Sequence, residues 1–140
     1  MENAYGRMRT NYFKVTDTEK LKKIVSKCQG TDGEKVVLFD EIVDGEILYG
    51  FGCSAHLQGY YDEETENYNY DDFLDDLQTV VAPGDAVIIM EIGYDKMRYV
   101  YGLANIVTSE KAESMDFTQL VIKKAAELLS NPDYKTKIEY

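Results

Sequence analysis

Two side chains able to act as nucleophile, base or metal ligand lie three residues apart at Cys53 and His56, and His56 is the only histidine in the chain. A zinc site needs three or four nitrogen or sulfur ligands, and the sequence offers at most two further candidates. On a β-strand, positions 53 and 56 point to opposite faces, which separates the two side chains. We therefore predict a buried Cys53, a solvent-facing His56, and neither a nucleophile nor a zinc site.

A calcium loop is the next chemistry that the spacing suggests, because residues 62–73 are twelve positions with acids at the first, third and fifth. An EF-hand requires glycine at its sixth position and glutamate at its twelfth, where this chain has Asn67 and Phe73. The Gly50-Phe51-Gly52 segment lacks the third glycine and the lysine of a phosphate-binding loop. The sequence therefore predicts no catalytic residue, no metal site and no cofactor.

The acidic residues are distributed very unevenly along the chain. The sixty residues from Val36 to Asp95 contain 15 of the 26 acids and no lysine or arginine, so all 15 basic residues lie in the flanks. Such a charge repels nucleic acid and anionic membrane surfaces. We therefore expect a protein partner, with no direct binding to nucleic acid or membrane.

The densest part of this segment is the predicted contact surface for that partner. Four of its aspartates form two like-charge pairs four residues apart on a predicted helix, and each pair costs roughly 0.2–0.5 kcal/mol, so helix stability does not explain them. Their spacing, about 1.9 Å of helix axis per charge, approaches the roughly 1.7 Å per charge of duplex DNA. Interleaved tyrosines are typical interface anchors. The predicted contact residues are Asp62, Glu63, Glu64, Glu66, Tyr68, Tyr70, Asp71, Asp72, Asp75 and Asp76. The alternative is a solvated surface that only keeps the protein soluble.

Hydrophobic periodicity predicts three helices and five strands that would position these residues. A capping box at Thr16–Glu19 opens the first helix, which ends at Gly30, and Asp44-Gly45 predicts a hairpin turn. The expected strands span 11–15, 36–43, 47–55, 86–92 and 97–107, and the later helices span about 73–81 and 116–129. We expect the last helix to bury Phe117, Leu120, Val121 and Leu128. Residues 56–70 are expected to be a polar connection.

The order of these elements contains a repeat. Residues 21–55 and 73–107 both contain a helix, a turn and two strands, and a Tyr-Gly pair falls at matching points, at Tyr49 and Tyr101. Two such αββ units predict an α+β domain with a mainly antiparallel sheet of four to five strands and three helices packed chiefly on one face. The predicted organisation is a flexible lead-in over residues 1–10 and a single domain over 11–140.

Composition limits the protein class. A chain of 140 residues with 44% hydrophobic residues can bury one core of ordinary size. Two cysteines do not make a disulfide framework, residues 1–10 contain no apolar run, and no apolar stretch reaches 18 residues. We therefore expect a cytoplasmic protein. The oligomeric state stays open, a homodimer included.

Three features carry a resemblance to known proteins: the acidic segment 62–76, the sixty residues without lysine or arginine, and the small size. In these features the chain resembles the DNA-mimic counter-defence proteins of phages and mobile elements, of the antirestriction and anti-CRISPR type. These proteins share no common fold, and they typically occupy the nucleic-acid site of a nuclease without catalysis. The resemblance implies a non-enzymatic inhibitor of a basic nucleic-acid-handling protein, a nuclease or CRISPR effector. An immunity protein for a toxin nuclease, and a structural or small-ligand-binding α+β domain, are the alternatives.

Overall fold

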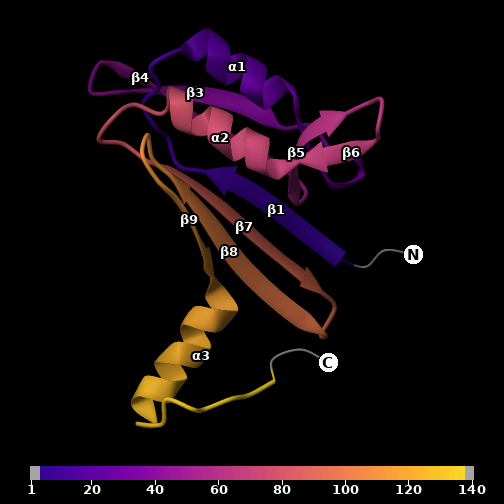
Figure 1. Ribbon diagram of the computed structural model, residues 1–140, viewed down its shortest axis with the longest axis vertical. Helices are drawn as coiled ribbons and strands as arrows, with labels where there is room; N and C mark the ends of the chain where they lie inside the picture. Colours follow the sequence, from indigo (N-terminus) through magenta and orange to yellow (C-terminus); the bar gives the residue numbers. More distant parts are fainter. Residues whose placement is uncertain (1–3, 138–140) are drawn as a thin grey trace.

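The computed structural model describes residues 4–137 and confirms the α+β class (Figure 1). The elements are β1 (Ala4–Thr10), α1 (Thr18–Ser26), β2 (Cys28–Gly30), a 3-10 turn (Thr31–Gly33), β3 (Val37–Val43), β4 (Glu46–Cys53), β5 (Leu57–Asp62), β6 (Asn67–Asn69), α2 (Tyr70–Val80), β7 (Val87–Asp95), β8 (Tyr99–Val107), β9 (Ala112–Asp116) and α3 (Phe117–Leu128). Within this part of the chain, no helix has both the length and the apolar character that a bilayer crossing needs.

The strands form two sheets in which every pairing is antiparallel. The larger sheet has six strands in the order β3-β4-β1-β7-β8-β9, and the smaller has three in the order β2-β5-β6. The predicted 36–43 and 47–55 hairpin is confirmed, with Ile42 opposite Ile47 and positive φ at both Asp44 and Gly45. The main sheet is therefore larger than the four to five strands expected, because β1 and β9 join it.

Strand β1 corrects the prediction of a flexible lead-in. Residues 4–10 are the third strand of the large sheet, between β4 and β7, with Met8 and Thr10 buried on one face. Arg7 and Arg9 alternate with them, and these charges hide the strand pattern in the sequence. The expected strand 11–15 makes only isolated bridges. Residues 1–3 of the predicted lead-in lie outside the described residues.

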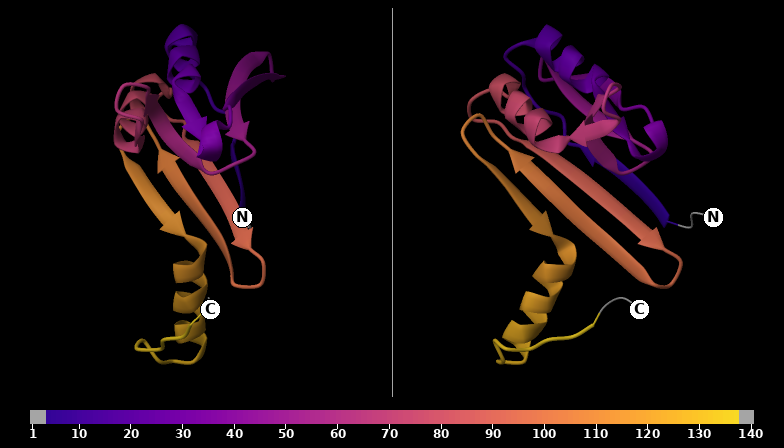
Figure 2. Two further views of the ribbon diagram at one scale, coloured as in Figure 1. Left: turned by 90° about the vertical axis from the view of Figure 1, so that its right-hand side faces the viewer. Right: turned by 45° about the vertical axis from the view of Figure 1, so that its right-hand side comes forward.

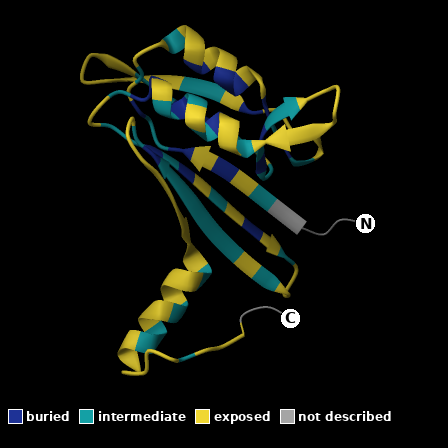
Figure 3. Cartoon of the chain, viewed as in Figure 1, coloured by how far each residue is buried: buried dark blue, intermediate teal, exposed yellow. Residues whose placement is uncertain are grey.

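The core lies between one face of the large sheet and helices α1 and α2, which lie side by side (Figures 1 and 3). Phe73 of α2 packs edge-to-face against Phe51 of β4 with ring centroids 6.1 Å apart, and Phe51 packs in the same way against Phe13. Helix α1 begins one residue later than the predicted capping box implies. Its N-cap is Asp17, whose carboxylate accepts a hydrogen bond from the backbone N–H of Lys20.

Helices α1 and α2 cover one face of the large sheet, in keeping with the expected packing chiefly on one face, whereas α3 does not join them. It starts directly after β9 and extends away from the body of the protein (Figures 1 and 2). None of its residues is buried, and the four that we expected to be inward are 40–79% exposed: Phe117, Leu120, Val121 and Leu128. The apolar stripe exists as predicted, but residues 4–137 of the same chain do not cover it.

Both predicted αββ units are present, but they are not adjacent. Strand β1 separates their hairpins, because it pairs with β4 on one side and β7 on the other. The segment 56–70 is also not an irregular connection, since it contains β5 and β6. These two strands and β2 form the small sheet, and this sheet carries much of the predicted acidic surface.

Candidate functional site

The predicted carboxylates lie together on two consecutive elements, and we call this group the acidic surface. Asp62, Glu63, Glu64 and Glu66 belong to the turn of the β5–β6 hairpin, and Asp71, Asp72, Asp75 and Asp76 belong to α2. Helix α2 begins at the residue that follows β6, so no linker separates the hairpin from the helix. The backbone thus fixes both groups of acids relative to each other.

The hairpin turn and the helix start are held by local hydrogen bonds. Asn69 is the N-cap of α2, where its side-chain oxygen accepts from the backbone N–H of Asp72 at 2.9 Å and its amide donates to the Asp72 carboxylate at 2.9 Å. In the turn, Glu66 has φ 59° and its N–H donates to the carbonyl of Asp62. Asp71 and Asp72 also lie in the first helical turn, where the helix dipole favours negative charge.

Seven of the eight carboxylates are exposed, and Asp76 is half-buried. Within residues 4–137, none of the eight forms an ion pair. The lysine-rich helix α1, which carries Lys20, Lys22 and Lys23 and has Lys27 as its C-cap, packs beside α2 without pairing with these acids. The basic helix α1 and the acidic helix α2 are therefore neighbours in space, although their charged side chains form no ion pairs with each other within residues 4–137.

Asp76 differs from the other seven because it is half-buried and hydrogen-bonded to a side chain of the small sheet. It accepts a 2.6 Å hydrogen bond from the hydroxyl of Tyr60. The ammonium of Lys27 lies 4.6 Å from the centroid of the Tyr60 ring. Burial raises the pKa of Tyr60, and the hydrogen bond to Asp76 raises it further. Asp76 therefore helps to attach the small sheet to α2, and the other seven acids make up the open part of the acidic surface.

The two predicted tyrosine anchors have different environments. Tyr68 is 38% exposed and faces Tyr61 across the hairpin, with ring centroids 5.2 Å apart. Tyr70 is half-buried: its ring lies 5.4 Å from that of Phe73, and its hydroxyl accepts a 2.8 Å hydrogen bond from the Asn105 amide. Burial raises the pKa of Tyr70. The aromatic pair beside the acids is thus Tyr61 and Tyr68, of which Tyr68 is exposed and Tyr61 half-buried. The sequence would have indicated this pair had residues 57–69 been predicted as a hairpin.

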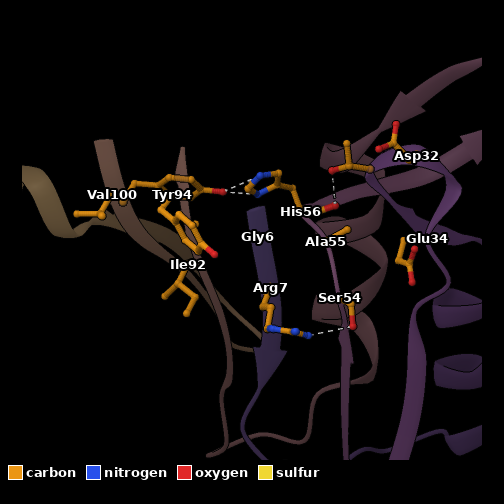
Figure 4. A pocket seen from close by; sticks show the side chains of 13 residues that line it. Gly6, Arg7, Asp32, Glu34, Ser54, Ala55, His56, Ile92, Tyr94 and Val100 are labelled. Carbon is orange, nitrogen blue, oxygen red and sulfur yellow. Dashed lines mark hydrogen bonds between the residues drawn. The ribbon is translucent and has the colours of Figure 1, made fainter. Parts of the chain in front are cut away.

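A second candidate site is a cleft of about 760 Å³ at the edge of β1, beside residues 54–56 (Figure 4). The predicted solvent-facing His56 is half-buried here, because its ring lies against Gly6, where a Cβ would collide with it. The ring of Tyr101 lies against Gly93 in the same way, and Gly6 and Gly93 are paired across β1 and β7. Two facing glycines thus make room for two aromatic rings.

The rings of the cleft belong to a hydrogen-bonded group. The Tyr101 hydroxyl hydrogen-bonds to the His56 ring, with Nε2 at 3.0 Å. Glu91 contacts the same histidine: its Oε2 lies 3.5 Å from Nδ1 of His56. Its other oxygen, Oε1, accepts a hydrogen bond from the backbone N–H of Leu57 at 2.8 Å. Arg7 donates to the hydroxyl of Ser54 at 3.2 Å at the mouth of the cleft. Sequence reasoning missed this group because its members come from segments that are far apart in the chain.

Cys53 is not part of that group. It is half-buried rather than fully buried, and its thiol donates to the carbonyl of Ala55 at 3.2 Å. Burial raises its pKa, which disfavours the thiolate that a nucleophile needs. Among the described residues there is also no cluster of three histidine, cysteine or carboxylate side chains that could bind a metal ion.

No family model, no curated protein and no solved structure matches the chain. The acidic surface and the cleft are therefore the two features on which a function can rest.

Proposed function

We propose that the protein is a non-enzymatic inhibitor that binds a basic, nucleic-acid-handling protein, a nuclease or CRISPR effector, through the acidic surface. The observation that carries the proposal is the group of seven exposed carboxylates on one rigid turn and the helix that follows it, none of them in an ion pair within residues 4–137. Their mutual repulsion lowers stability, so a partner that neutralises them is the simplest reason for their arrangement.

The phosphate-binding groove of such a partner is chemically complementary to the acidic surface. Arginine and lysine in such a groove bind carboxylates through the same charge-assisted hydrogen bonds that they make with phosphate oxygens. The Tyr61–Tyr68 pair, of which Tyr68 is exposed, lies beside the acids, and tyrosine is enriched among the residues that contribute most to binding energy. Inhibition then follows from occupation of the groove, and the protein itself needs no catalytic residue.

The test starts with the wild-type protein as bait in lysate of its native cell, followed by identification of the captured basic protein. Reversal of Asp71, Asp72 and Asp75 to lysine is expected to abolish binding and inhibition, with the fold preserved because these side chains are exposed. Asp76 is left unchanged because it is bonded to Tyr60. Binding should also weaken steeply with added salt, because exposed charges are screened beyond about 8 Å at physiological ionic strength.

The matched control reverses Asp40, Glu41 and Asp44 to lysine, which changes the net charge equally at the exposed β3–β4 hairpin. This control should still bind, and duplex DNA should compete with the wild-type protein for one site on the partner. Equal loss in the two triple variants, or simultaneous binding of DNA and inhibitor, would contradict the proposal.

A second candidate function is the binding of a small ligand in the cleft, and the volume of the cleft favours this function. About 760 Å³ lies within the roughly 300–1,000 Å³ typical of ligand pockets, and the imidazole, phenol and guanidinium of His56, Tyr101 and Arg7 can orient a polar ligand. A thermal-shift screen of metabolites tests this function. A true ligand should raise the melting temperature of the wild-type protein and of the acidic-surface variant, but have little effect on Tyr101→Phe.

A further inference from the structure

The large sheet has a second face, opposite α1 and α2, that no helix covers; we call it the back face. On β7, β8 and β9 it carries large apolar side chains that are 42–62% exposed: Met90, Ile92, Val100 and Met115. The strand register makes them neighbours, because Ile92 lies opposite Gly102 and Ala104 lies between Met90 and Met115. On β7, β8 and β9 the back face is thus an apolar surface, and Arg7 and Arg9 of β1 border it.

The exposed stripe of α3 continues this surface. A Cβ at Gly102 would lie 3.4 Å from the side chain of Phe117, which places the start of the stripe against the back face. The opposite side of α3 already has a neighbour, since Ile122 and Ala126 lie beside Pro132 and Tyr134 of the segment that follows the helix. The Phe117–Leu120–Val121–Leu128 stripe is therefore the side of the helix still to be covered.

The apolar stripe of α3 does not pack along the sheet of its own chain, because the helix points away from that sheet. Asp116 is both the last residue of β9, paired with Leu103, and the N-cap of α3, accepting from the N–H of Thr118 at 2.8 Å. No loop separates the strand from the helix, and α3 leaves the sheet in the direction that Figures 1 and 2 show. An isolated helix of 12 residues is only marginally stable in water.

We propose that a second copy of this chain covers these surfaces, with α3 of each copy packed on the back face of the other. One two-fold axis then provides both contacts, because each chain has one unpartnered helix stripe and one uncovered sheet face. The eight exposed side chains amount to an area on the order of 800 Å² per copy, which equals what each partner of a standard interface buries.

The charge distribution agrees with this partner. Residues 96–137, which include β8, β9 and α3, have seven basic and five acidic residues, whereas residues 36–95 have fifteen acidic and no basic residues. The back face and α3 lie away from the β5–β6 hairpin (Figure 1). Two copies can therefore associate through β8, β9 and α3 and through the apolar Met90 and Ile92 of β7, while both acidic surfaces stay exposed. The inference does not depend on the proposed inhibitory function.

Light scattering coupled to size-exclusion chromatography tests the proposal on the full chain at micromolar concentration. We expect twice the chain mass of 16.0 kDa for the wild-type protein, and 16.0 kDa for Ile92→Glu and for Leu120→Glu. Both substitutions are at exposed positions, and far-UV circular dichroism should show that the fold survives. The matched control is Ile42→Glu, at a position that is 72% exposed on the β3–β4 hairpin, and it should remain a dimer.

Hydrogen exchange identifies the element that is covered. Amides of residues 117–128 should be protected in the wild-type protein and lose about tenfold or more of that protection in Ile92→Glu, although the substitution lies on the sheet. A wild-type mass of 16.0 kDa would overturn the proposal, as would a dimer that survives both substitutions. Equal protection of α3 in monomeric Ile92→Glu would also overturn it, since the helix would then be covered within its own chain.

Discussion

Helices α2 and α3 are alike in length, apolar pattern and N-cap, but they differ in what surrounds them. They have 11 and 12 residues, each has an apolar stripe, and each begins at a side-chain N-cap, Asn69 or Asp116. Helix α2 leads from the small sheet to β7 of the large sheet, so it crosses the core and buries Phe73, Leu77 and Val80. Helix α3 leaves the edge strand β9 and buries no residue. An apolar stripe thus shows that a helix needs a neighbour, but not that its own chain provides it.

The largest expected effect comes from replacing a phenylalanine by alanine in each of the two helices. Phe73→Ala removes a fully buried ring and should lower the free energy of unfolding by about 3–5 kcal/mol. Phe117→Ala should lower it by less than about 1 kcal/mol in dilute solution, where the ring is 56% exposed. Urea denaturation of both variants measures this. Similar losses would mean that α3 belongs to the core of a single chain.

Alkaline pH should weaken the α1–α2 half of the molecule. Burial raises the pKa of Cys28 to about 12, from 9.0 for a free thiol, and burial also raises the pKa of Tyr60. The folded state then holds protons that the unfolded state releases, so stability falls as the pH rises from about 9 toward about 12. For Cys28 alone the loss is about 1.4 kcal/mol per pH unit in that window. Urea midpoints across this range measure it, and Cys28→Ala should have a shallower decline.

The two faces of the sheet can be compared through their glycines. Gly6→Ala would place a Cβ against the His56 ring, and overpacking of this kind costs about 1–3 kcal/mol. Gly102→Ala, on the back face, makes only an ordinary contact with Phe117 at 3.4 Å and should be nearly neutral. In a double-mutant cycle by thermal denaturation, His56→Ala should relieve most of the Gly6→Ala loss. Additive losses would show that His56 does not lie on Gly6 in solution.

The smallest expected change in stability comes from removing the N-caps of the two helices. Asn69→Ala should lower global stability by about 1 kcal/mol, because the cap holds a helix that is part of the core. Asp116→Ala removes an equivalent hydrogen bond, yet in dilute solution it should only increase amide exchange within residues 117–128 and leave the urea midpoint unchanged. A midpoint shift as large as that of Asn69→Ala would indicate that α3 unfolds together with the core.

The sequence was sufficient where the signal is local. Asp44-Gly45 predicted a hairpin turn because both residues accept positive φ, and the Phe73–Leu77–Val80 spacing predicted the inward side of α2. The sequence was insufficient where charge masks a strand, as at Arg7 and Arg9 of β1, whose side chains alternate with the buried Met8 and Thr10. It also failed for β9, an exposed five-residue strand whose only sign is its pairing with β8.

Some features of the candidate site could likewise be predicted from the sequence, and others depended on the tertiary structure. The sequence by itself determined that carboxylates gather on residues 62–76, because they are neighbours along the chain. Only the tertiary structure decided that Tyr61 rather than Tyr70 packs against Tyr68, and that Asp76 is bonded to Tyr60. It also placed His56 on Gly6 and beside Tyr101, three residues from three separate parts of the chain. The physical reason is range: turns, caps and helix faces depend on residues within about four positions, whereas burial and side-chain pairing between strands depend on which distant segments share a sheet.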